Sequence, residues 1–514
     1  MTGQTRTLLT TLLLAPLAVL HAADAAPLLV RWGGMTNPNM VSTATGLPED
    51  PGSNAPLWEV KLGTHQYSIP TLDRGRVYIG ASDAVVTRPG YTPTGGGVVM
   101  CVDQATGKLL WQLASPRYMA GVKPPYHFDQ WKCGICSGPV VDGDRVFVVG
   151  NRGDILCLDR DGQAGGRAGS PTDELAYMGI TNCTPDTALG PTDGRIVWRY
   201  DMLMELGVVP HDVCGSTLLL VGDRLYACTS NGLDDRHKKV PAPLAPSLIV
   251  LDKKNGRLVA RDDEKIGQRL FHCNWSSPSA AQVNGRTLIF FGGGDGVLYA
   301  FEPPAPVADG SVQLLKKAWA YDCNPPDYRF RDGQPVPYSL WNRNSPDGPS
   351  EIIGTPVCHN GRVYATIGQS PVHGNGHGCL SCVDAATGKK IWDSQLVDRT
   401  LATPAIADGL LYLPDTTGHL HCFDAVTGQR YWVHPLGAKC WIASAFVADG
   451  KVYISTEDSV LWVLKHDKAL HVLSRTQLKS RAITPTAVDG VLYLPTQRSL
   501  LAIPGKSVAN KVQP

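Results

Sequence analysis

The segment ATPAIADGLLYLPD at Ala402–Asp415, followed by LHCFDAVTGQRYW at Leu420–Trp432, decides the fold of this 514-residue chain. In each part, apolar and polar residues alternate on both sides of a tight turn, which is D-G in the first part and T-G in the second. This pattern predicts two β-hairpins. Joined end to end, the two hairpins make one antiparallel sheet of four short strands.

The first hairpin recurs along the whole chain. Its eight copies are Ser68–Gly80, Ser137–Gly150, Gly215–Thr229, Ser276–Gly292, Gly354–Gly368, Ala402–Asp415, Ala443–Thr456 and Ile483–Thr496. The second hairpin, which closes on a tryptophan, follows several of them, as at Val98–Trp111 and Leu380–Trp392, with weaker copies at Leu248–Ala260 and Leu298–Trp319. Four-stranded units that repeat about every 40 residues are typical of a β-propeller, in which each sheet packs against its neighbours.

The two ends of the repeat region complement each other. The eighth hairpin is followed by only one more strand, Ser499–Gly505, whereas Leu57–Gly63 has the outer-strand pattern but precedes the first hairpin. Pairing these two segments would complete the last sheet and remove exposed edges. We therefore predict an all-β, eight-bladed β-propeller over residues 57–505, between an N-terminal extension (26–56) and a C-terminal tail (506–514). The alternative is seven blades plus a stray hairpin.

The first 25 residues predict a secretory signal peptide. A start with one arginine precedes the apolar stretch Thr7–Leu20, and a cleavage site of small residues follows, after Ala25 or after Ala22. No cysteine stands at this site to carry a lipid anchor, and no later stretch is apolar enough to span a membrane. We expect a soluble monomer in the periplasm or outside the cell.

The nearly equal numbers of basic and acidic residues limit the kinds of partner that the chain can bind. The chain has 47 Lys+Arg and 46 Asp+Glu, a formal net charge of +1. This value excludes a chain-wide electrostatic attraction to nucleic acid or to anionic lipid. We expect a small anionic ligand or a protein of the cell envelope as the partner.

The repeat, together with RWGGMTNPN at Arg31–Asn39, resembles the PQQ-like (quinoprotein-type) β-propeller repeat family. That family includes quinoprotein alcohol dehydrogenases and the envelope scaffold BamB. The resemblance implies the propeller fold and leaves pyrroloquinoline quinone (PQQ) open as a cofactor. However, the chain lacks the Cys-Cys pair that stacks on the quinone in those enzymes, the C-x-x-C-H motif of a haem module, and the lipid-anchor cysteine of BamB.

Two sets of repeated residues predict core packing rather than chemistry. Cysteine shares one repeat position with Ala300, which predicts small buried side chains with unpaired thiols at Cys101, Cys157, Cys382 and Cys422. The outer-strand tryptophans should dock between blades and bury large apolar areas; they are Trp58, Trp111, Trp198, Trp319, Trp392 and Trp432.

The residues just before the hairpins should surround one mouth of the central channel. Three consecutive blades place the cations Arg399, Lys439 and Arg481 there. Convergent cations can hold an anion through charge-assisted hydrogen bonds, and a tryptophan can supply a stacking surface. The other candidates at this mouth are Trp275, Trp441, His65, His272, Asp212 and Glu351. The alternative interpretation is a polar mouth filled by ion pairs and water.

The glycine-rich insert HGNGH contains a weaker candidate. His373 and His377 could both reach one metal ion if the loop folds back, although a solvated loop explains the same residues. No catalytic residue is assigned, because G-x-S-x-G, P-loop and H-E-x-x-H motifs are absent.

Three functions follow from these patterns. The sequence favours a non-enzymatic ligand-binding or scaffolding module with its site at the channel mouth. The first alternative is a PQQ-dependent dehydrogenase of an alcohol or sugar, with Arg399, Lys439 and Arg481 on the quinone. The second is an assembly scaffold resembling BamB.

Overall fold

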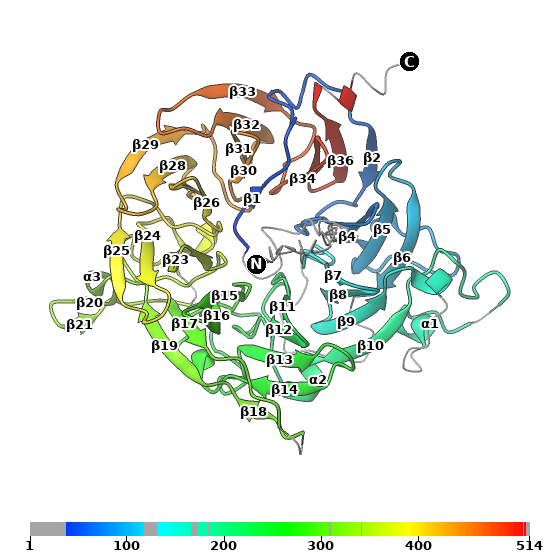
Figure 1. Cartoon of the computed structure of the whole chain (residues 1–514). Helices are drawn as coiled ribbons and strands as arrows, with labels where there is room; N and C mark the ends of the chain where they lie inside the picture. The colour runs from blue at the N-terminus through cyan, green and yellow to red at the C-terminus, as the bar shows by residue number, and fades with distance from the viewer. Residues whose placement is uncertain are drawn as a thin grey trace, which may run out of the picture.

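Eight antiparallel sheets stand radially around a central axis in the computed structural model, which describes residues 38–117, 131–165, 173–182, 184–307, 310–340, 342–506 and 508–509 (Figure 1). This is the eight-bladed propeller that the sequence predicted. The predicted signal peptide lies outside the described residues, as do positions 26–37 of the extension.

Each blade has four strands, counted from the axis outward. Blades 1 to 4 consist of β3 (Thr71–Asp73), β4 (Arg76–Ser82), β5 (Gly97–Asp103) and β6 (Leu109–Ser115); β7 (Val140–Asp142), β8 (Arg145–Val149), β9 (Asp154–Asp159) and β10 (Ile196–Asp201); β11 (Leu219–Val221), β12 (Arg224–Cys228), β13 (Leu248–Asp252) and β14 (Leu258–Arg261); and β15 (Ser279–Val283), β16 (Arg286–Gly292), β17 (Val297–Phe301) and β19 (Lys317–Asp322).

Blades 5 to 8 follow the same order. They consist of β22 (Val357–His359), β23 (Arg362–Ile367), β24 (Cys379–Asp384) and β25 (Lys390–Ser394); β26 (Ala405–Ala407), β27 (Leu410–Pro414), β28 (His419–Asp424) and β29 (Arg430–Pro435); β30 (Phe446–Ala448), β31 (Lys451–Ser455), β32 (Val460–Lys465) and β33 (Val472–Gln477); and β34 (Thr486–Val488), β35 (Val491–Pro495), β36 (Ser499–Pro504) and β2 (Trp58–Lys61).

The remaining elements are short. They are α1 (Glu174–Tyr177), α2 (Met202–Leu206), α3 (Pro326–Arg329), the hairpin of β20 (Phe330–Arg331) and β21 (Gln334–Pro335), and the added strands β1 (Val41–Ser42) and β18 (Gln313–Leu314). Within the described part of the chain, no helix has the length and hydrophobicity needed to cross a bilayer.

The ring closes through its two ends. β2 pairs antiparallel with β36, so that Trp58 lies opposite Ala502 and Lys61 opposite Ser499. This pairing confirms the predicted closure. The N-terminal extension adds β1 as a fifth, parallel strand beside β30 of blade 7. Asn39 also exchanges two hydrogen bonds with the main chain of Ile406 in blade 6, at 2.7 and 2.8 Å.

Six blades share one row of side chains across their second, third and fourth strands. In blade 6, Cys422 lies between Tyr412 and Trp432, whose ring centroids are 5.8 Å apart. The other rows are Tyr78–Cys101–Trp111, Phe147–Cys157–Trp198, Phe290–Ala300–Trp319, Tyr364–Cys382–Trp392 and Tyr493–Ala502–Trp58. The two rings close over a small residue, which explains why cysteine and alanine alternate here.

The cysteines of these rows behave as core residues. All four are fully buried free thiols, as predicted: Cys101, Cys157, Cys382 and Cys422. Cys379 and Cys382 do not form a redox pair, because residues three apart on β24 point to opposite faces of the blade. Each of the two packs into a different hydrophobic cluster.

Each of these tryptophans also docks on the next blade. The indole N–H of Trp58 donates to Gln104 O in the outer turn of blade 1, at 3.0 Å. Four others make the equivalent bond, namely Trp111, Trp198, Trp319 and Trp432. A glycine in the turn lies against the ring: a Cβ on Gly107, whose φ is +70°, would be 2.8 Å from the Trp58 indole. The predicted role of the tryptophans between blades is confirmed.

Blades 3 and 7 lack the tryptophan and use other contacts. The central residue of the row is then larger, Val250 or Val463. Blade 4 instead extends β18 onto the outer edge of β14. On β33, Thr476 Oγ1 donates to the carboxylate of Asp50 in the extension at 2.8 Å.

We expect Gly107→Ala to destabilise the fold more than Gly75→Ala does. Both glycines lie in turns of blade 1 with φ near +70°, so both substitutions cost about 1–2 kcal/mol of backbone strain. A Cβ at Gly75 meets open space, whereas one at Gly107 meets Trp58 and costs about 1–3 kcal/mol more. Urea unfolding of the two variants measures this difference, and equal midpoints would contradict the docking role of Trp58.

Candidate functional site

The eight innermost strands begin at the same end of the channel, which we call the loop mouth. A cavity of about 150 Å³ lies there, lined by residues of all eight blades. Its wall combines apolar and aromatic residues, such as Ile353, Leu401 and Trp275, with glycines and small hydroxyl residues. For example, Thr217 N donates to Ser277 Oγ at 2.9 Å, and Ser444 N donates to Thr484 Oγ1 at 2.8 Å. These hydroxyls therefore join neighbouring blades.

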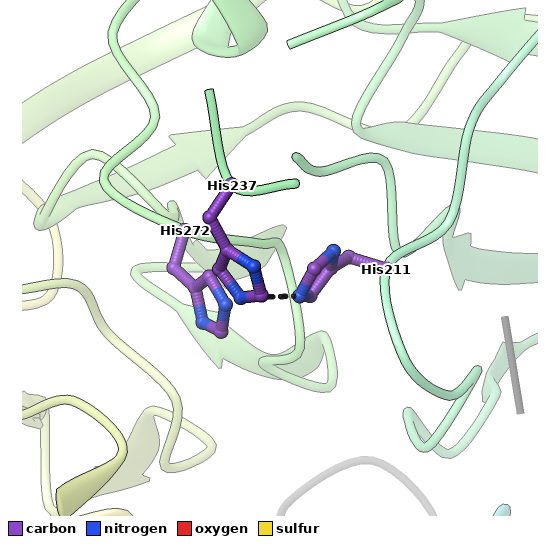
Figure 2. A group of neighbouring side chains, drawn as sticks. All are labelled: His211, His237 and His272. Carbon is purple, nitrogen blue, oxygen red and sulfur yellow. Dashed lines mark hydrogen bonds between the residues drawn. The ribbon is translucent and has the colours of Figure 1, made fainter. Parts of the chain in front are cut away.

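Long connections of blades 3, 4 and 5 gather four histidines at this mouth. His211 and His272 precede the first strands of blades 3 and 4, and His237 and His373 lie in the loops β12–β13 and β23–β24. The rings of His211 and His237 have centroids 4.5 Å apart, as have those of His211 and His272. The His373 ring lies 4.5 Å from that of His272. Figure 2 shows His211, His237 and His272 as one group.

Main-chain hydrogen bonds fix the positions of these residues. His211 N donates to Ser230 O at 3.2 Å, and Leu233 N donates to His272 O at 3.1 Å. The β12–β13 loop therefore holds one histidine on each side. His237 N closes a turn by donating to Asp234 O at 3.0 Å, and its ring lies 4.5 Å from that of His211 and 5.1 Å from that of His272.

The hydrogen-bond partner of His211 identifies the ring nitrogen that carries the hydrogen. Its Nδ1 lies 3.0 Å from Leu233 O. A carbonyl oxygen only accepts, so Nδ1 carries the hydrogen, and Nε2 of the neutral ring keeps a lone pair. This Nε2 lies 3.1 Å from His237 Nε2, as the dashed line in Figure 2 shows.

Burial shifts the pKa values of three ionisable side chains near the histidines. It raises the pKa of Glu351 to about 8 and that of Asp212 to about 7, although a hydrogen bond with Trp131 lowers the latter. It lowers the pKa of His373 to about 4, with a further contribution from His237. At neutral pH, Glu351 is therefore mostly protonated and His373 is neutral. Perturbed pKa values that gather in one cleft are typical of functional sites.

Glu351 lies in the protein interior next to His272 and Cys273. Its side chain is fully buried, and Oε2 accepts from Cys273 N at 3.2 Å. The other oxygen lies 3.9 Å from His272 Nδ1. Asp212 Oδ1 lies 3.7 Å from His211 Nε2, the atom that also faces His237.

Two of the three cations singled out from the sequence are engaged within the protein. Arg399 is completely buried, and its terminal nitrogens donate to four main-chain oxygens; these belong to Ser345, Gly348, Gly374 and Asn375. This arginine fastens two connections to each other. Arg481 forms an ion pair with Glu457, whereas Lys439 is exposed.

The remaining candidates lie in different surroundings. The Trp275 ring meets that of His272 edge-on at 4.9 Å, and its N–H donates to Val213 O at 3.1 Å. Trp441 and His65 are half-buried. The structure separates His373 from His377, which is 61% exposed and lies with Nδ1 3.4 Å from Asp398 Oδ1.

A second polar group lies beside His377. Asp398, Asp415 and His419 bring their ligand atoms within 4.8 Å of one another. Asp415 is already bonded to His421 Nε2 at 2.8 Å and accepts from Thr417 Oγ1 at 2.7 Å. This second group is therefore an internally satisfied network.

The comparisons with known proteins match this fold. Residues 95–164 and 376–509 match the family model described as outer membrane protein assembly factor BamB. These two stretches match a PQQ-like repeat model, in line with the sequence resemblance, and the chain as described is a β-propeller. No curated protein sequence matches the chain.

Solved structures with the same architecture have low sequence identity. BamB from Moraxella catarrhalis is 14% identical over 88% of this chain and 99% of its own, with a TM-score of 0.54. A europium-containing methanol dehydrogenase is 14% identical over 94% and 92%, with a TM-score of 0.57. A quinohemoprotein alcohol dehydrogenase from Pseudomonas putida HK5 is 12% identical over 92% and 81%, with a TM-score of 0.56. These likenesses concern the fold.

The described residues at the loop mouth do not fit PQQ. The guanidinium groups of Arg399 and Arg481, which could neutralise its carboxylates, are used by loop carbonyls and by Glu457. The channel cavity of about 150 Å³ is smaller than the roughly 300 Å³ of a typical small-molecule pocket. In addition, the sequence contains no Cys-Cys pair to stack on the quinone.

We expect Glu351→Gln to retain most of the stability and Glu351→Ala to lose about 1–3 kcal/mol. The amide can still accept from Cys273 N, whereas alanine leaves that buried N–H without its partner. Because folding raises the pKa of Glu351 to about 8, its stabilising contribution is complete below its usual pKa and is lost as the pH rises to about 8.

Urea unfolding between pH 5 and pH 8 tests both statements. The free energy of unfolding of the wild type should fall toward pH 8, and Glu351→Gln should reduce this slope. An equal slope in the two proteins would show that Glu351 is ionised in the folded state.

Proposed function

We propose that the chain is an exported ligand-binding propeller, with its ligand held at the loop mouth above blades 3, 4 and 5. The observation that carries this proposal is the convergence of four histidines and two carboxyl groups from separate connections. His211, His272 and Glu351 are each at most 2% exposed. Burial of so many ionisable groups opposes folding, which favours a role in binding over a role in packing.

The family match does not extend over the four histidines of the loop mouth. The matched residues 95–164 and 376–509 leave out the part of the chain that contains the histidine group and Glu351. The proposal of ligand binding therefore rests on the geometry of the mouth residues and not on the family match. The export part of the proposal rests on the apolar stretch and cleavage site in residues 1–25.

Native mass spectrometry of the chain purified from its own cells tests this function. We expect a chain that starts at residue 26 or 23 and carries extra mass that is lost on denaturation. Asp212→Asn at the loop mouth should reduce this extra mass. Asp489→Asn is the matched control, because both aspartates have positive φ (56° and 51°) and Asp489 lies in a turn at the opposite mouth.

Absence of extra mass in the wild type, or equal loss in both variants, would contradict binding at the loop mouth. A full-length mass that includes residues 1–22 would contradict the export.

The alternative function, a PQQ-dependent dehydrogenase, requires that the purified chain take up the quinone. Because the mouth residues do not fit the quinone, we expect no stoichiometric uptake when PQQ and Ca²⁺ are added to the purified chain. Absorption spectroscopy after gel filtration measures the uptake. Uptake of one equivalent that Arg481→Ala reduces would overturn our proposal in favour of the dehydrogenase.

A further inference from the structure

We propose that His211, His237 and His272 bind one divalent transition-metal ion. This inference rests on the proposed function, because it names the ligand of the same mouth. One ring nitrogen of each residue lies within 4.8 Å of the other two. The three come from separate connections, two of which cross between blades and one of which is the β12–β13 loop.

The donor set defines the class of ion. Neutral imidazole nitrogens suit zinc, copper, nickel and cobalt, whereas calcium and magnesium require mostly oxygen ligands. The group of three contains no carboxylate. The inferred ion therefore differs in class from the hard, oxygen-bound cations.

The spacing agrees with one ion between the rings. Zinc–nitrogen bonds of about 2.0–2.1 Å place two ligands of a tetrahedral ion about 3.3 Å apart. His211 Nε2 and His237 Nε2 are 3.1 Å apart. His272 needs only a side-chain rotation to complete the set, because its nitrogen is already within 4.8 Å of both.

An outer partner orients one of the ligands. A metal-binding histidine usually directs its second ring nitrogen to a carbonyl or a carboxyl group. His211 Nδ1 has Leu233 O at 3.0 Å, and His272 Nδ1 has Glu351 Oε1 at 3.9 Å. The bond to Leu233 O leaves His211 Nε2 for the proposed ion, whereas 3.9 Å is too long for a hydrogen bond between His272 and Glu351.

His373 is a neighbour rather than a fourth ligand. Its ring lies 4.5 Å from that of His272 and 5.5 Å from that of His237, but its nitrogens lie outside the group of three. Three protein ligands leave a coordination position open, as in zinc sites that bind water or a substrate. His373 and Trp275 would form the wall beside this position.

The inference is tested by titrating Co²⁺ into the complete mature chain after a chelator has removed any bound metal. We expect one equivalent of Co²⁺ to give the visible absorption of a four- or five-coordinate site, and Zn²⁺ to displace it. Loss of an outer partner already weakens metal binding about 10–100-fold. His237→Ala should therefore weaken binding more than about 100-fold, and its ring is only half-buried, so the fold should survive.

Three further variants make the test specific. His373→Ala should weaken binding no more than about tenfold. His419→Ala, in the second polar group, and His359→Ala, at the end of β22 near the opposite mouth, should bind as the wild type does. Thermal unfolding confirms that each variant is folded.

The inference is overturned if Co²⁺ gives no absorbing complex, or if His237→Ala and His419→Ala behave alike. These results do not decide the proposed function. If native mass spectrometry still detects a ligand that Asp212→Asn reduces, the mouth binds a ligand other than a metal ion.

Discussion

The docking of a tryptophan from one blade on the outer turn of the next is the constraint on which the ring depends. The indole lies across a small residue on its own sheet and against a glycine on its neighbour, as Trp58 does with Ala502 and Gly107. Both small residues are needed because the ring fills the space on each side. Five junctions follow this rule; at a sixth, Trp432 donates to Asp467 O in a turn without glycine. These six contacts set the spacing between blades.

The candidate site lies at one of the two junctions without this contact. Between blades 3 and 4, Gly232 pairs with Cys273, and the side chain of Asn274 donates to Asn231 O at 3.1 Å. Leu233 N donates to His272 O in the same region. The contacts that position the histidines are therefore also contacts that join the two blades, and a change in one affects the other.

The features that could be predicted from the sequence are those that the repeat determines. The hairpins, the tryptophans and the buried cysteines recur at equivalent positions of the repeat, and the closure by β2 follows from the incomplete eighth copy; all four were predicted. The histidine group has no such signal, because it forms where three irregular connections meet. His272 was a candidate from its place before a hairpin, but His237 lies within an insert that carries no periodicity. Likewise, the partners of Arg399 are main-chain carbonyls, which residue identities do not reveal.

The closure between β2 and β36 determines when the molecule can become complete. Ser499 Oγ on β36 donates to Glu59 on β2, 440 residues earlier in the chain. β2 therefore cannot complete blade 8 until β36, at the other end of the repeat region, is also available. Contacts so distant in sequence form slowly. Until the two strands pair, one edge of blade 8 stays open, and an open sheet edge can pair with another chain and aggregate.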